Sequence, residues 1–167
     1  MSFFTYVDFP AVPEELFEYA YDAIQNQPLL LDRKRMIETA NAVTDKSIDH
    51  LLDTERAYHR FIVAKPLSDY IYTFLEPDYE VYMQTIKGGM RTAIHIDLDR
   101  HYVYNYIIDT GGPRVFTNWY NSQRKIIESV EIEPFRWHQI DVSQLHNVSG
   151  ATPGRTRLAI TAFRPSK

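Results

Sequence analysis

Residues 79–109 read YEVYMQTIKGGMRTAIHIDLDRHYVYNYIID, and this stretch decides the fold. It is rich in aromatic and β-branched residues, which favour strands, and Gly88-Gly89 interrupts it with a turn. The pattern predicts strands at 79–87, 91–97 and 101–109. In the middle strand polar and apolar residues alternate, so that strand has one polar and one apolar face.

The chain after residue 109 continues with short apolar segments separated by turn residues such as Gly111-Gly112 and Pro153-Gly154. We expect further strands at 114–120, 125–132, 136–142, 146–149 and 156–163. Eight short strands within about 85 residues are typical of a sandwich or barrel, and this number fits a jelly roll, also called a double-stranded β-helix.

The first 78 residues differ and are expected to be mainly helical. Pro13 followed by two glutamates favours a helix start, and apolar residues then recur at helical spacing as far as Ile24. Further helices are expected at 35–41 and 66–75, whereas 47–62 fits either a helix or a strand.

The chain is therefore expected to form one domain, 1–167, of the α+β class and mainly β. Its N-terminal part, 1–78, would supply helices that pack on one sheet of the double-stranded β-helix formed by 79–167. A chain of 167 residues with 44% hydrophobic and 24% charged residues fits one soluble domain with its own core.

Charge and composition exclude several classes of function. The net charge of −4 argues against nucleic acid as a partner, and no apolar run reaches the roughly 20 residues that span a bilayer. The N-terminus lacks a secretory signal, so we expect a cytoplasmic protein without a membrane partner. Because the chain has no cysteine, a metal would have to be held by His, Asp or Glu.

His95 and Asp97 are two residues apart, which places both on the same face of the predicted strand 91–97. A carboxylate on a buried strand needs a partner, and a divalent cation would be one. His146 begins another predicted strand, which could lie beside the one that holds His95 and Asp97. Two histidines and one carboxylate leave metal positions open, as in non-haem iron(II) oxygenases. His50, His59 and His138 are expected to be structural or surface residues.

Arg157 strengthens this hypothesis. It alternates with Leu158 and Ile160 along the last predicted strand, so it lies on the face opposite their aliphatic side chains. An arginine that points into a barrel needs an anion, and its planar guanidinium suits a carboxylate. Arg155 has the same parity and could serve instead, or both could lie on a solvated edge strand.

The last 85 or so residues resemble the 2-oxoglutarate- and iron(II)-dependent dioxygenase superfamily, close to its aspartyl/asparaginyl and prolyl hydroxylase branches. The resemblance rests on the pattern of His95-x-Asp97, His146 and Arg157, together with the segments Tyr104-Asn105-Tyr106, Thr117-Asn118-Trp119-Tyr120 and Asp141 to Val148. The arginine lies one residue further from the last histidine than is commonest in the family, which leaves the choice between Arg155 and Arg157 open.

The resemblance implies a reaction and a set of roles. His95, Asp97 and His146 would ligate Fe(II), and Arg157 or Arg155 would bind the distal carboxylate of the co-substrate 2-oxoglutarate. O2 would be consumed, 2-oxoglutarate would be decarboxylated to succinate, and a C–H bond of a small molecule or peptide side chain would be hydroxylated. Further pocket contacts would come from Tyr82, Gln84, Asn105 and Trp119.

Two other functions fit the same pattern. A cupin-like metal enzyme without 2-oxoglutarate would use His101 as a ligand and give the arginines no special role. A jelly-roll binding module would need no metal, because fold alone does not determine function. The substrate cannot be read from the sequence.

Overall fold

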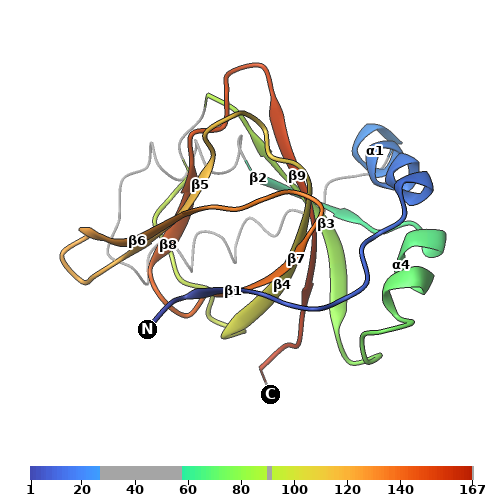
Figure 1. Cartoon of the computed structure of the whole chain (residues 1–167), viewed down its shortest axis with the longest axis horizontal. Helices are drawn as coiled ribbons and strands as arrows, with labels where there is room; N and C mark the ends of the chain where they lie inside the picture. The colour runs from blue at the N-terminus through green and yellow to red at the C-terminus, as the bar shows by residue number, and fades with distance from the viewer. Residues whose placement is uncertain (27–57, 90–91, 167) are drawn as a thin grey trace.

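The computed structural model describes residues 1–26, 58–89 and 92–166 (Figure 1). The predicted helix 35–41, His50 and the first part of the ambiguous segment 47–62 lie outside these ranges. Within them no helix is both long and apolar enough to cross a membrane.

Two antiparallel sheets make up most of the described chain. The large sheet has the order β1-β7-β4-β9-β3-β2 and the small sheet the order β6-β5-β8. The strands are β1 (Phe4–Tyr6), β2 (Tyr58–Ile62), β3 (Glu80–Lys87), β4 (Tyr102–Asp109), β5 (Phe116–Tyr120), β6 (Ile126–Glu131), β7 (Trp137–Asp141), β8 (His146–Ser149) and β9 (Thr156–Phe163).

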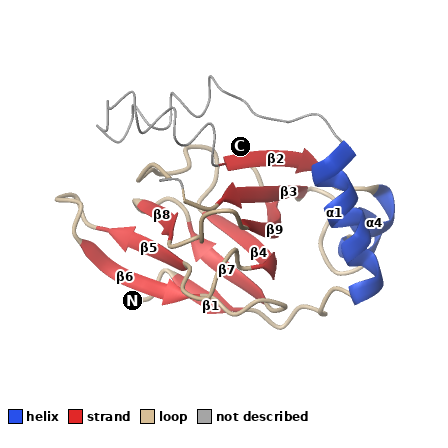
Figure 2. Cartoon of the chain, turned by 90° about the horizontal axis from the view of Figure 1, so that it is seen from above, coloured by secondary structure: helices blue, strands red, loops and turns tan. Residues whose placement is uncertain are grey.

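Helical structure in the described N-terminal residues is short. It comprises the 3-10 turn η1 (Glu14–Leu16), α1 (Phe17–Asn26) and α4 (Lys65–Ile71). Figures 1 and 2 show α1 and α4 on one side of the large sheet and the small sheet on the other. The mainly β architecture with helices packed on one sheet agrees with the expectation from sequence.

The predicted strands after residue 78 are confirmed within one to two residues at their ends, with one exception. The predicted strand 91–97 is wrong as a strand, because among residues 92–97 only His95 forms a bridge, with His146. The cause is the chain opposite. β8 begins at His146, so Asp97 lies beside the preceding turn, and its amide bonds the Val142 carbonyl at 2.8 Å.

β1 and β2 were not predicted, although 58–62 belongs to the segment left ambiguous. They pair with β7 and β3 and form the two edges of the large sheet. The strand that pairs with β1 lies far along the chain, and a helix separates β2 from its partner β3. Short local sequence patterns therefore carry little information about either pairing.

The large sheet buries both of its faces. Its outer face packs against α1 and α4 in a cluster that includes Leu67, Ile71, Tyr106, Leu158 and Ile160. Its inner face packs against the small sheet in a second cluster that includes Tyr82, Ile107, Trp119, Ala159 and Phe163. Along β9, odd-numbered residues therefore face the space between the sheets, and Arg157 is one of them.

Candidate functional site

His95 and His146 are held side by side by their backbones. Each donates its amide to the carbonyl of the other, at 3.0 and 2.9 Å, which adds His95 to the small sheet beyond β8. The centroids of the two imidazole rings are therefore only 4.4 Å apart. The pairing thus fixes the separation of two imidazoles that are 51 residues apart in sequence.

Both imidazoles are oriented in the same way. Nδ1 of His95 lies 2.9 Å from the Ala93 carbonyl, and Nδ1 of His146 lies 2.8 Å from the Gln144 carbonyl. Because a carbonyl only accepts, Nδ1 carries a proton in each ring, which leaves Nε2 as the nitrogen through which each ring can bind a metal. Such hydrogen bonds typically fix the tautomer of metal-binding histidines.

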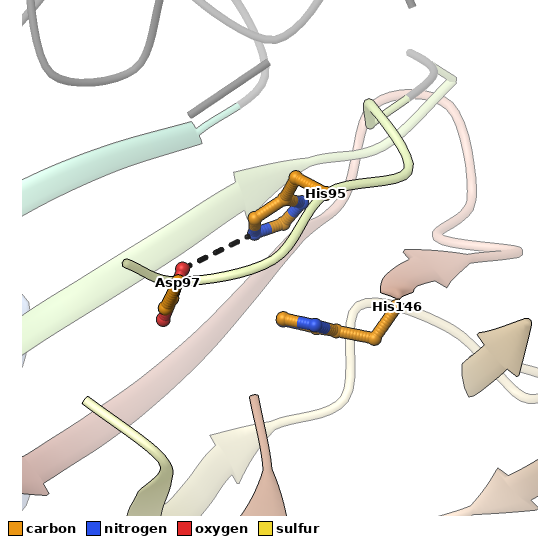
Figure 3. A group of neighbouring side chains, drawn as sticks. All are labelled: His95, Asp97 and His146. Atoms are coloured by element: carbon orange, nitrogen blue, oxygen red, sulfur yellow. Dashed lines mark ion pairs between the residues drawn. The ribbon is translucent and has the colours of Figure 1, made fainter. Parts of the chain in front are cut away.

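Asp97 completes the cluster. Its Oδ1 lies 3.6 Å from Nε2 of His95, and one ligand atom from each of the three residues lies within 4.8 Å of the others (Figure 3). A cluster of two imidazoles and one carboxylate offers the donor set that Fe(II) takes in facial-triad sites. The structure thus brings together the three residues that the sequence nominated.

Arg100 orients the carboxylate. Its Nε donates to Oδ2 of Asp97 at 2.7 Å, while its guanidinium stacks on the Phe163 ring at 4.2 Å and is only 3% exposed. Oδ1 remains directed towards His95. Burial would raise the pKa of Asp97, but Arg100 and the two histidines hold it at about 2, so this carboxylate is ionised.

His146 is also in a state that can bind metal. Burial, helped by the neighbouring His95, lowers its pKa to about 4. It is therefore neutral around pH 7, as a metal ligand must be. His101, the ligand of the cupin-like alternative, is exposed and is not part of the cluster.

Arg157 lies in the space between the sheets. It lines a small cavity together with Ile107, Thr110, Val115, Thr117 and Ile132. It is 4% exposed, and among the described residues no hydrogen bond or carboxylate partner reaches its guanidinium. Burial lowers its pKa to about 10, which still leaves it charged at pH 7. Burying a cation is costly unless an anion accompanies it, so this guanidinium is suited to binding one.

Arg155 is placed differently. It precedes β9, its side chain is 50% exposed, and it donates to Asp109 at 3.3 Å. The loop between β4 and β5 packs closely against the start of β9. Gly111 in this loop has a φ of +78°, and a Cβ there would lie 2.8 Å from the Arg157 amide nitrogen. Of the two arginines, only Arg157 faces the interior.

The other nominated residues lie on the inner walls. Nε2 of Gln84 and the Thr161 hydroxyl both donate to Oδ1 of Asn105, at 3.3 and 2.6 Å. Trp119 neighbours His146 across β5 and β8, but its indole N–H is already used by the Asp141 carbonyl at 2.9 Å. Trp119 is thus available for packing rather than for a polar contact.

His138 was expected to be a structural or surface residue, and it is wholly buried on β7. Its Nδ1 lies 3.3 Å from the Arg136 carbonyl, whereas its Nε2 has no partner among the described residues. Burial, and then the nearby Arg157, lower its pKa from 6.5 to about 3. The histidine is therefore neutral in the folded protein.

His138 gives a stability prediction. Between pH 6.5 and 3 the unfolded chain binds a proton at this position and the folded protein does not, so stability falls as the pH falls. His138→Leu should reduce this slope by up to about 1.4 kcal/mol per pH unit. Chemical denaturation across that window measures it, and identical slopes for both proteins would refute the assignment.

Comparisons with known proteins find similarity only in three dimensions. No family model matches the chain, and no curated protein sequence matches it. A Pseudomonas putida prolyl-4-hydroxylase is 12% identical with a TM-score of 0.45, over 91% of this chain and 99% of that one. The Fe(II) form of HppE with the alternative substrate (S)-1-HPP is 6% identical with a TM-score of 0.46, over 83% of this chain.

Other neighbours include a Streptomyces albus 2-hydroxyethylphosphonate dioxygenase with Fe(II) bound, at 18% identity, a TM-score of 0.41 and 66% of this chain. The chain spans 56% of the HppE chain and 22% of this dioxygenase. At these identities the neighbours assign no family, and the function has to be inferred from the residues of the site itself.

Proposed function

We propose that the protein is an Fe(II)- and 2-oxoglutarate-dependent dioxygenase that hydroxylates a C–H bond of a small molecule or a peptide side chain. The observation that carries the proposal is the combination of two features on facing sheets. One is the cluster of His95, Asp97 and His146, and the other is Arg157, a buried cation without an anionic partner among the described residues.

The strand arrangement supports a double-stranded β-helix. Along the chain β3, β4, β7 and β9 enter the large sheet, while the segment around His95, β5, β6 and β8 enter the small one. Such alternation between two facing antiparallel sheets is how a jelly roll is wound. The cluster lies at the edge of the small sheet, where β8 and the His95 segment meet.

The residues present fit the metal. Both Nε2 lone pairs and one carboxylate oxygen are free to bind it, and no thiolate competes because the chain has no cysteine. When bound, Fe(II) would supply activation of O2. The overall reaction would convert substrate, O2 and 2-oxoglutarate to hydroxylated product, succinate and CO2.

Arg157 would bind and orient the co-substrate. Its guanidinium suits a carboxylate in a bidentate contact, and the hydroxyls of Thr110 and Thr117 line the same cavity. One carboxylate of a dicarboxylate would be held there, and the other end of the molecule would bind the metal. Asn105, Gln84 and Thr161 form a hydrogen-bonded wall on the same face of the large sheet.

The test is turnover of 2-oxoglutarate by the purified protein. With Fe(II), O2 and ascorbate as the reductant that takes the second oxygen atom to water, we expect slow formation of succinate and CO2 in equal amounts even without substrate, and none with a chelator or in His146→Ala. Succinate can be measured by NMR. If Fe(II)-loaded, folded protein neither binds 2-oxoglutarate nor converts it, the chain is not an enzyme of this kind, and a metal-free binding module becomes the better hypothesis.

A further inference from the structure

Arg60 lies on β2, an edge strand of the large sheet, and faces the same side as the metal cluster. It pairs across the strands with Gln84, an inner-face residue. Its guanidinium carbon lies 4.5 Å from the centroid of the Tyr82 ring and 5.7 Å from that of Tyr58. Its Nε donates to the Tyr58 hydroxyl at 3.1 Å, so two aromatic rings hold the cation in place.

Arg60 is close to the metal ligands through one intervening side chain. The ring of Tyr82 lies between Arg60 and Arg100, whose guanidinium carbon is 5.8 Å from the ring centroid. Arg100 in turn bonds Asp97. The cation on β2 is therefore linked to the metal cluster through the contacts of Tyr82, Arg100 and Asp97.

No carboxylate neutralises Arg60 among the described residues. The groups that act on it there are Tyr58, Tyr82 and Arg100. Burial would lower the pKa of Arg60, but the two tyrosines raise it, so the side chain stays charged. Among the described residues no hydrogen bond occupies the guanidinium NH2 groups, and the Tyr58 hydroxyl, which accepts from Nε, still has a proton to donate.

Counted over the described residues, the charges of a site loaded with metal and co-substrate would not balance. Fe(II) and the guanidinium groups of Arg60, Arg100 and Arg157 would bring five positive charges. Asp97, Asp99 and the two carboxylates of 2-oxoglutarate would bring four negative ones. Arg100 is paired with Asp97, and Arg157 would be paired with the co-substrate. The charge left over is that of Arg60.

We propose that Arg60 and Tyr58 form a subsite for an acidic group of the substrate, so that the enzyme oxidises a molecule bearing a carboxylate or phosphate. The inference rests on the proposed function. The planar guanidinium would take two oxygens of the acid, and the Tyr58 hydroxyl would donate a further hydrogen bond. Carboxylate and phosphate share this chemistry, and the reactive C–H bond would lie between the acid and the metal.

The test uses protein loaded with Mn(II) and 2-oxoglutarate, because Mn(II) shortens the nuclear relaxation times of molecules that bind near it. The probes are acetate and methyl phosphate, with neutral acetamide as the reference. We expect saturable relaxation of at least one acid and none of acetamide. Arg60→Gln should weaken acid binding at least about tenfold, and Arg60→Lys less. The stronger of the two acids identifies the group.

Arg136→Gln is the matched control. Arg136 also stacks on a tyrosine, Tyr6, at 3.7 Å, but at the opposite edge of the same sheet. It should bind the acids like the wild type. Equal binding of acid by wild type and Arg60→Gln, or equal binding of acetamide, overturns the inference.

Binding of 2-oxoglutarate to each sample separates the two hypotheses. The subsite inference is refuted, and the proposed function is not, if 2-oxoglutarate binds normally but the acids do not. It also fails if Arg60→Gln loses 2-oxoglutarate, because Arg60 would then hold the co-substrate. A wild type that binds no 2-oxoglutarate refutes the proposed function, and the subsite with it.

Discussion

Arg157→Met is expected to weaken 2-oxoglutarate binding at least about a hundredfold, because truncating one partner of a buried charge pair costs roughly 2–5 kcal/mol. Fe(II) affinity should stay unchanged, because Arg157 is not one of the three clustered ligands. The stability of the free protein should rise or stay constant. In that state the guanidinium is buried without an anion among the described residues, and methionine removes its desolvation cost.

The opposite signs of these two effects make the variant informative. Calorimetry with Mn(II)-loaded protein measures co-substrate affinity, and denaturant unfolding measures stability. Arg155→Met is the control, since that exposed side chain bonds Asp109 alone among the described residues and should change neither quantity much. A large loss of 2-oxoglutarate affinity in Arg155→Met, with none in Arg157→Met, would reverse the assignment.

Asp97→Asn is expected to abolish Fe(II) binding and to destabilise the protein by about 3–5 kcal/mol, because it removes the carboxylate that is hydrogen-bonded to the buried Arg100 and leaves Asp99 at 3.8 Å. Arg100→Met alone should destabilise the protein less than Asp97→Asn does, because Asp97 is more exposed than Arg100. It should also weaken metal binding about 10–100-fold, as loss of an outer-shell contact does.

The double variant separates the two roles of Asp97. Asp97→Asn with Arg100→Met removes both charges, so most of the lost stability should return while metal binding should not. Urea unfolding and metal titration of the four proteins complete the cycle. If the double variant is no more stable than Asp97→Asn, the ion pair does not hold the site together.

Much of the β architecture could be read from the sequence because strand residues alternate with a period of two. Arg157, Ala159 and Thr161 face inwards and Leu158 and Ile160 outwards, as the pattern in the last strand predicted. Because Arg155 and Arg157 are two residues apart, the alternation alone could not tell which of them faces the interior. That difference arises because β9 begins at Thr156, which leaves Arg155 at the surface.

Other parts depend on contacts between distant segments. Arg100 could pair with Asp97 or Asp99 by sequence alone, and only the turn after the metal ligands brings its Nε to Asp97 at 2.7 Å and leaves Asp99 at 3.8 Å. Arg60 was not identified from the sequence, because residues 47–62 fitted either a helix or a strand. The local signal for a strand there was the content of β-favouring residues, namely Tyr58, Phe61 and Ile62.

The most direct test of the central proposal is an anaerobic titration of Fe(II)-loaded protein with 2-oxoglutarate, followed by visible absorption. Chelation of Fe(II) by a 2-keto acid gives a charge-transfer band. The site geometry predicts that this band appears and saturates in the wild type, needs far more 2-oxoglutarate in Arg157→Met, and is absent in His146→Ala. Fe(II)-loaded wild type that shows no band at saturating 2-oxoglutarate would contradict it.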